Sequence, residues 1–287
     1  MKKHSLWYRI KRAVIFFFGD VRRLSHFPWV TWDVYYKSVD YTEAMDALGC
    51  VKAGDVGIHR DDGYFSNLVI PGFFKHAWIH LNDGKTKAEI MEAVSEGVLR
   101  RHALHSIVSD YTVILRPPEG TVTAADVSLA VGYAEKLEGC EYDVDFNFNI
   151  EKEHADLGKH TVSTENCSFR ETDASLAVAH RTLMAFSPPE ERAFLGEAKD
   201  NLQQKFGAFS CTEVASFCWW HKRRELKIRR KRYGGKEIIA ADDFLNGFDI
   251  VWASKKVTPE AAKKFGLSNE AIRKIKAWRE AHDKPKI

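Results

Sequence analysis

The chain has few cysteines for its length, and no regular spacing relates those that it has. Its 287 residues include five cysteines, an odd number. Such a set favours a reducing compartment over a disulfide framework. Zinc-finger, Rossmann and P-loop spacings are also missing, and Cys167 with His154 and His160 matches no common zinc motif. We therefore expect no metal, no cofactor and a cytoplasmic protein.

Long hydrophobic runs are missing as well. The uninterrupted apolar run near the start, residues 13–18, is far shorter than the ~20 residues that span a bilayer. It is also short for a signal-peptide core, and no small-x-small cleavage site follows it. Residues 2–23 combine this run with basic residues, which predicts a basic, aromatic amphipathic helix. Such a helix could lie on an anionic membrane surface, or it could pack its Phe-rich face on the domain.

A strong excess of charge of either sign is missing too. The chain has 43 basic and 40 acidic residues, a net charge of +3, which is too small to indicate nucleic acid as the main partner. Its hydrophobic content of 45% and charged content of 29% allow one good core, so we expect one domain with insertions. Basic residues gather at 221–224 and 229–232, after the last cysteine. They could contact phosphates or form a solvated face.

Cys211 begins an apolar helical pattern. Apolar residues recur at i, i+3, i+4, i+7 and i+8 from it, as Val214, Ala215, Cys218 and Trp219. This spacing predicts a helix with one buried face. At a first helical turn, unpaired N–H groups and the positive end of the helix dipole favour a thiolate over a thiol. The alternative is a small buried hydrophobic residue, which is what we expect of Cys218.

A series of strand and turn patterns precedes this helix. The first is a turn leading into a strand, and the second is a strand that starts at His76. The series occupies residues 54–60, 75–81, 90–94, 97–98, 111–116, a helix at 124–137, and then 142–146 and 209–214. This order resembles the permuted papain-like amidases, the circularly permuted branch of the NlpC-type cysteine hydrolases, in which the histidine strand precedes the cysteine helix. The resemblance covers about residues 51–254.

The resemblance implies an α+β fold in which an antiparallel sheet packs against the cysteine helix. We expect three parts: an N-terminal amphipathic, basic helical segment at 1–45, a hydrolase domain at 46–255, and a C-terminal helical tail at 256–287. A segment at about 149–206 looks inserted into the domain. In the tail, Thr258 and Ser268 are predicted N-caps of two short helices, the second running to about His282.

By the same resemblance, Cys211 is the nucleophile, His76 the base, and Glu92 the acid that orients the imidazole. Tyr142 matches a tyrosine beside the oxyanion hole, and we group Asp55 and Trp78 with it as candidates for oxyanion or substrate contacts. The family usually has small residues around its histidine where this chain has Lys75 and Trp78. Substrate shape is therefore left open.

Two of these assignments have competitors. Strand alternation puts His80 on the same face as His76, so either imidazole could be the base, and chain order favours His76. We expect the other histidines to be exposed or satisfied by local hydrogen bonds. Residues 87–104 also fit an amphipathic helix, on which Glu92 would belong to a solvated face. Gly97 interrupts that helical period, and we expect a strand.

Together these features predict a cysteine hydrolase that cleaves an amide or ester bond through an acyl-enzyme. The resemblance implies a peptide-like amide or an acyl lipid as substrate, and the basic N-terminal segment favours lipid and peripheral attachment to a membrane. The alternative is a binding or scaffold protein that keeps the fold without turnover. The presence of Cys211, His76 and Glu92 together speaks against that alternative.

Overall fold

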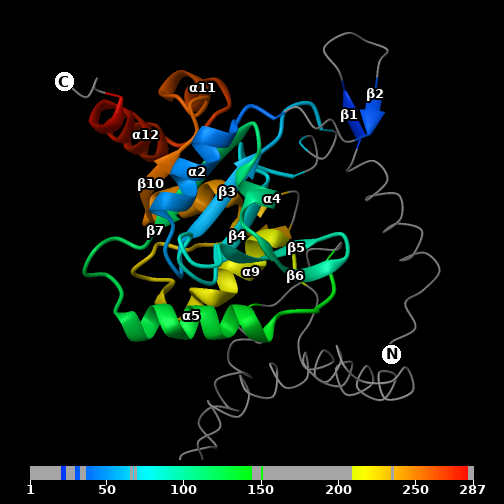
Figure 1. The fold of residues 1–287 in the computed structure, drawn as a ribbon, viewed down its shortest axis with the longest axis vertical. Helices are drawn as coiled ribbons and strands as arrows, with labels where there is room; N and C mark the ends of the chain where they lie inside the picture. Colours follow the sequence, from blue (N-terminus) through cyan, green and yellow to red (C-terminus); the bar gives the residue numbers. More distant parts are fainter. Residues whose placement is uncertain are drawn as a thin grey trace, which may run out of the picture.

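A computed structural model describes residues 21–23, 30–32, 37–64, 67, 70–143, 150, 209–233 and 236–283. Its centre is a six-stranded antiparallel sheet in the order β10-β7-β3-β4-β5-β6 (Figure 1). The strands are β3 (Val56–Arg60), β4 (His76–His80), β5 (Glu89–Val94), β6 (Gly97–His102), β7 (Tyr111–Arg116) and β10 (Asp249–Ala253). The expected α+β class with an antiparallel sheet is confirmed.

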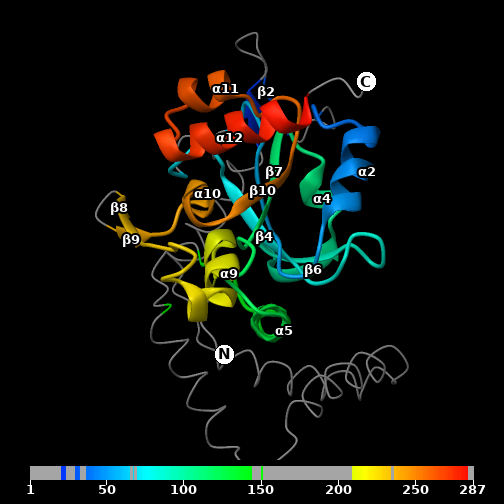
Figure 2. The same ribbon diagram turned by 90° about the vertical axis from the view of Figure 1, so that its left-hand side faces the viewer.

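Helices cover both faces of this sheet. The cysteine helix α9 (Cys211–Cys218) and α5 (Ala124–Lys136) pack on one face, where Ala77, Ile79 and Met91 join their buried side chains in one core. On the other face α2 (Tyr41–Cys50) and α4 (Leu104–Ile107) enclose a second core with Trp78 and Ile90. Figure 2 shows α9 and α2 on opposite sides of the strands. Strand alternation explains the division, because neighbouring residues of β4 and β5 face opposite ways.

The hairpin of β5 and β6 settles the choice between helix and strand for this segment. Glu92 pairs with Leu99, and Val94 pairs with Gly97 at the turn. Gly97 has a φ of 121°, and a Cβ there would lie 2.5 Å from the Cys140 carbonyl oxygen. Only glycine accepts both that backbone conformation and that close approach. The residue that interrupts the helical period is therefore the one that the hairpin requires.

The C-terminal helices dock on the domain as expected. Thr258 caps α11 (Pro259–Lys264), and Ser268 caps α12 (Asn269–His282), each by accepting a hydrogen bond from a backbone N–H three residues on. Ala271 and Ile275 of α12 are buried in the same core as α9. The tail is thus part of the packed structure.

The N-terminal residues, the inserted segment and the first domain boundary were the remaining expectations about the organisation of the chain. The last residues of the predicted N-terminal helix, Val21–Arg23, instead form β1, which pairs with β2 (Val30–Trp32). Residues 2–20 and nearly all of the inserted segment 149–206 lie outside the described residues, and the expected boundary at 45/46 falls inside α2. Among the residues described, no helix is both long enough and apolar enough to cross a bilayer.

The basic residues after Cys218 do not extend the cysteine helix. That helix ends at Cys218, and a 3-10 turn, η1 (Trp220–Lys222), follows it. Arg223 and Arg230 then lie over the ring of Trp220, with their guanidinium carbons 5.0 and 5.9 Å from its centroid. The later basic residues enter a hairpin of β8 (Lys231–Tyr233) and β9 (Lys236–Ile238).

Candidate active site

Cys211 is the first residue of α9, with Ser210 as the N-cap. The backbone N–H of Ser210 donates a hydrogen bond of 2.6 Å to the Glu213 carboxylate, as part of a capping box. This cap fixes the start of the helix and therefore the place of the thiol. Cys211 is 6% exposed. Its own N–H is among the first four of the helix, which have no partner inside the helix and can bind an oxyanion.

His76 begins β4 and makes an ion pair with Glu92 on β5. Its Nε2 lies 2.8 Å from Glu92 Oε2, an arrangement that follows from the pairing of Trp78 with Glu92 two residues further along β4. Glu92 is 2% exposed and accepts a second hydrogen bond, of 2.6 Å, from Ser106 Oγ. Burial alone would raise the pKa of Glu92, but the hydrogen bond and charge of His76, with help from Ser106, lower it to about 2.

The thiol of Cys211 lies next to the backbone at the start of β4. Its Sγ is 3.7 Å from the carbonyl oxygen of Lys75, the residue before His76. Burial alone would lower the pKa of His76, but the charge of Cys211, a hydrogen bond with it, and Glu92 together raise that pKa to about 10. These interactions favour the protonated, imidazolium form of His76 beside the Glu92 carboxylate.

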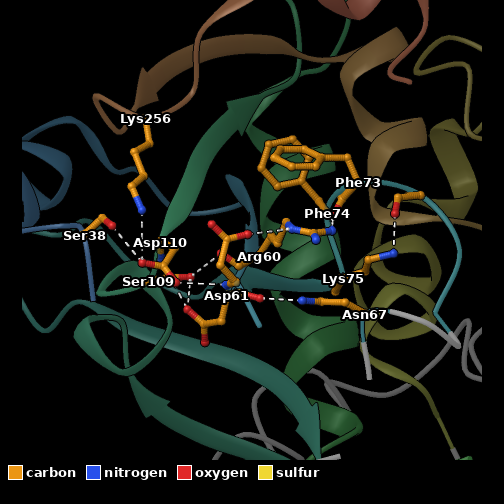
Figure 3. Close-up of polar contacts among 12 residues, drawn as sticks. Ser38, Arg60, Asp61, Asn67, Phe73, Phe74, Lys75, Ser109, Asp110 and Lys256 are labelled. Atoms are coloured by element: carbon orange, nitrogen blue, oxygen red, sulfur yellow. Dashed lines mark hydrogen bonds and ion pairs between the residues drawn. The ribbon is translucent and has the colours of Figure 1, made fainter. Parts of the chain in front are cut away.

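The loop before β4 is held by polar contacts that fix the start of the strand. Backbone N–H groups of Phe73 and Phe74 donate to the two carboxylate oxygens of Asp242, at 2.6 and 2.7 Å. The Arg60 guanidinium donates to the Phe73 carbonyl oxygen at 3.1 Å (Figure 3). Lys75 donates through its ammonium to the carbonyls of Ile70 and Gly72. His76 is therefore anchored by contacts on both sides of the loop.

Cys211 lines a small pocket of about 20 Å³. Most of the pocket wall is aliphatic, and its polar groups are few. The lining residues are Ile70, Pro71, Lys75, Tyr142, Cys211, Thr212, Ile238, Ile239, Ala240 and Ala241. Burial, followed by the charge on nearby Arg60, lowers the pKa of Lys75 to about 8. The mostly aliphatic wall suits an apolar group, and Cys211 is part of the same lining.

Tyr142 reaches the pocket through a short parallel pairing with Phe209, two residues before Cys211. The Phe209 N–H donates to the Glu141 carbonyl at 2.8 Å, and the Asp143 N–H donates to the Phe209 carbonyl at 3.2 Å. Burial, then the charges of Cys211 and Glu213, raise the pKa of Tyr142 well above its ordinary value. The phenol therefore keeps its proton and can donate a hydrogen bond.

The structure does not bring Asp55 to this pocket. Asp55 lies beside His80, at the far end of β4 from His76. Its two carboxylate oxygens accept bonds of 2.8 and 2.7 Å from Arg116, and it also accepts one from the Lys52 N–H. With 1% exposure and these partners, its position is that of a buried ion pair that joins β3 to β7.

Trp78 and His80 are also away from the pocket. Trp78 is 0% exposed and lies over Gly57, where a Cβ would come 2.0 Å from its ring. Its indole N–H donates to His80 Nε2 at 3.0 Å. Burial, with the charge of Arg116, lowers the pKa of His80 to about 3, so its imidazole is neutral and its Nε2 is occupied. Since Nε2 accepts from Trp78, the ring proton is on Nδ1, so His80 has neither the place nor an available unprotonated nitrogen to act as the base for Cys211.

Two residues next to the triad were not identified from the sequence. His59 stacks on His76, and Ser106 binds both His59 and Glu92. We expected histidines such as His59 to be exposed or locally satisfied, but His59 bonds to a residue 47 positions away. The only sequence signal was strand alternation in β3, which has no meaning for the site until the register with β4 is known.

Metal binding has no support among the described residues. They contain no group of three or more His, Cys, Asp or Glu side chains that could hold a metal ion. Cys167, His154 and His160 lie outside the described residues.

Comparison of the chain with protein-family models, with curated proteins and with solved structures gave no match. The function is therefore inferred from the geometry and chemistry of the site.

Proposed function

We propose that this protein is a cysteine hydrolase that cleaves an amide or ester bond through an acyl-enzyme. One observation carries the proposal: His76 Nε2 lies 2.8 Å from the Glu92 carboxylate, and the thiol at the start of α9 lies 3.7 Å from the carbonyl oxygen of Lys75, the residue next to His76. A nucleophile, a base and a group that orients the base are the parts of a thiol triad. The three residues come from β4, β5 and the helix α9, which packs on both strands.

In the first half-reaction the Cys211 thiolate attacks the carbonyl carbon, and a C–S bond forms as the carbonyl π pair moves to oxygen. We assign two hydrogen-bond donors to that oxyanion: the backbone N–H of Cys211 at the start of α9, and the phenol of Tyr142 in the pocket lining. The tetrahedral intermediate then collapses and breaks the bond to the leaving nitrogen or oxygen. His76 donates its proton to that leaving group, and the acyl-enzyme thioester remains.

In the second half-reaction a water molecule attacks the thioester while His76 removes its proton. The C–S bond breaks, the carboxylic acid leaves, and the thiolate and imidazolium are restored. Glu92 keeps the imidazole in one orientation and stabilises its positive charge in both halves, since its Oε2 accepts from Nε2.

The pocket and its surroundings favour an acyl lipid over a peptide-like amide. The wall next to Cys211 is largely aliphatic, which favours contact with an apolar acyl group. Strand β9 leads from the basic hairpin directly into that wall, since Ile238 belongs to both. Residues 222–236 hold nine basic and one acidic residue, a net charge of +8, so the other 272 residues sum to −5. This basic stretch thus ends two residues before the pocket residue Ile238, where it would favour anionic headgroups and peripheral attachment to a membrane.

The test is to incubate the protein with a mixed panel of acyl lipids, acyl amino acids and muropeptides and to identify products by mass spectrometry. We expect Cys211-dependent release of a carboxylic acid from one class, with lipids first, and no release by Cys211→Ala. A Cys211→Ala variant that forms the same products at the wild-type rate would contradict the proposed function. Products from muropeptides alone would contradict the lipid preference and leave the thiol chemistry standing.

A further inference from the structure

His59 lies next to His76 on the neighbouring strand. The two residues are directly paired in the antiparallel register of β3 and β4. Their rings are stacked, with centroids 4.9 Å apart and planes at 29°. The ring of Trp78 lies 5.5 Å from that of His59 and 6.3 Å from that of His76. One face of the His76 ring is therefore covered by a second imidazole, so the ring has little room to rotate about its χ angles.

The hydrogen bond of His59 fixes which form this second imidazole takes. Its Nδ1 is 2.8 Å from the carbonyl oxygen of Ser106. A carbonyl oxygen only accepts, so Nδ1 carries the proton. Burial and the charge of His76 lower the pKa of His59 to about 4, although Asp61, Ser106 and Glu92 act in the opposite direction. His59 is therefore neutral at neutral pH and presents the face of an uncharged ring to the His76 imidazolium.

Ser106 joins this imidazole to the acid of the triad. Its backbone carbonyl accepts from His59, while its Oγ donates to Glu92 Oε2 at 2.6 Å. Ser106 is 2% exposed and belongs to the four-residue helix α4, which packs against β3. One residue thus holds both groups that flank His76. A shift of α4 would move the stacked ring and the carboxylate together.

From these contacts we propose that His59 and Ser106 are positioning residues for the proposed reaction, acting through His76 and Glu92 rather than on the substrate. His59 supports the charged imidazole by stacking, and Ser106 sets the orientation of the stacked ring and of the carboxylate. The inference rests on the proposed function for its purpose. It can be tested without any substrate, because the reactivity of the Cys211 thiol reports the state of His76.

The experiment measures the rate at which iodoacetamide alkylates Cys211 between pH 4 and pH 9, by peptide mass spectrometry. The variants are His59→Ala, His59→Phe and Ser106→Ala, and the control is His105→Ala, an exposed histidine on the same helix α4. A less stabilised imidazolium supports the thiolate less, so the acid limb of the profile should move to higher pH. We expect a move of about one pH unit in His59→Ala and Ser106→Ala, which is about tenfold in rate at a fixed pH on that limb.

His59→Phe keeps a neutral ring on His76, so its profile should stay close to that of the wild type. A merely structural role would give a different pattern, with lower thermal stability and an unchanged midpoint. If His59→Ala gives the same midpoint as His105→Ala, the proposal is overturned. If His59→Ala does not fold, His59→Leu, which fills the same space without a ring, takes its place in the comparison, and Ser106→Ala separately tests the Oγ bond to Glu92. Shifted midpoints in a protein that hydrolyses nothing would refute the proposed function alone.

Discussion

Replacing Glu92 by glutamine tests how much the carboxylate contributes to the site. The pKa of Glu92 falls from an ordinary 4.5 to about 2 although the residue is buried. At about 1.4 kcal/mol for each tenfold change, this corresponds to roughly 3 kcal/mol of favourable interaction with the folded protein. His76 is the first of the stabilising partners, and Ser106 and His59 contribute the rest. We therefore expect Glu92→Gln to cost the His76 imidazolium about 1–2 kcal/mol, which is about 5- to 30-fold in thiol reactivity at pH 6.

The same pair predicts a pH window for stability. The lowered pKa of Glu92 stabilises the fold above about pH 4.5, and this contribution is lost as the pH falls toward 2. The raised pKa of His76 stabilises the fold below about pH 6.5, and that contribution is lost as the pH rises through about 10. The difference in unfolding free energy between wild type and Glu92→Gln should thus be largest near pH 5–6 and smaller at pH 3 and pH 10.

The assay combines iodoacetamide alkylation of Cys211 with urea unfolding across this range. The matched control is Glu96→Gln, because Glu96 is on the turn of the same hairpin and its side chain is 62% exposed. We expect the control to match the wild type in both measurements. Alkylation of Glu92→Gln within twofold of the wild type at pH 6 would refute the reasoning that the carboxylate supports the imidazolium.

Three further outcomes follow from the site. Iodoacetamide at neutral pH should modify Cys211 faster than the other four cysteines, which are Cys50, Cys140, Cys167 and Cys218. Equal labelling of Cys211 and the others, measured by peptide mapping, would remove the case for a nucleophile. On a substrate that the protein hydrolyses, His76→Ala should lose nearly all activity, and the double variant with Cys211→Ala should be little worse. His80→Ala should stay active. If His80→Ala is inactive while His76→Ala is active, the choice of base is wrong. Full-length protein should sediment with anionic vesicles but not with neutral ones, and sedimentation should weaken at high salt and when residues 2–23 are deleted. Absence of the protein from the anionic and the neutral vesicle pellets would contradict the membrane proposal.

The sequence predicted the elements that carry the site better than it predicted the surroundings of each residue. Ser210 and the apolar spacing after Cys211 mark the start of α9, because an N-cap and a buried face are local signals. The strand that starts at His76 is equally local. The ion pair with Glu92 needed the register of β4 and β5, which was reached through a family resemblance and not from the residues alone.

The residues that prediction misplaced depend on partners far along the chain. Alternation correctly puts Trp78 on the face of His76, but its ring is buried over Gly57, and a glycine inside a strand was the available sign of that close approach. Asp55 was a candidate for oxyanion or substrate contacts, and only the fold shows that Arg116 binds both of its carboxylate oxygens. Beyond the strand alternation in β3, nothing in the sequence pointed to His59 and Ser106, since a stack across two strands and a bond over 47 residues leave no local pattern.

The central claim is that Cys211 forms an acyl-enzyme with the help of His76, and trapping that intermediate tests it most directly. Intact-mass spectrometry of the protein mixed rapidly with activated acyl esters of several chain lengths would detect it, and peptide mapping would locate it. The account predicts a single added acyl group on Cys211 that decays as the acid is released, and no such adduct on His76→Ala over the same time. An adduct on another residue, or one on Cys211 that forms and decays equally well without His76, would contradict it.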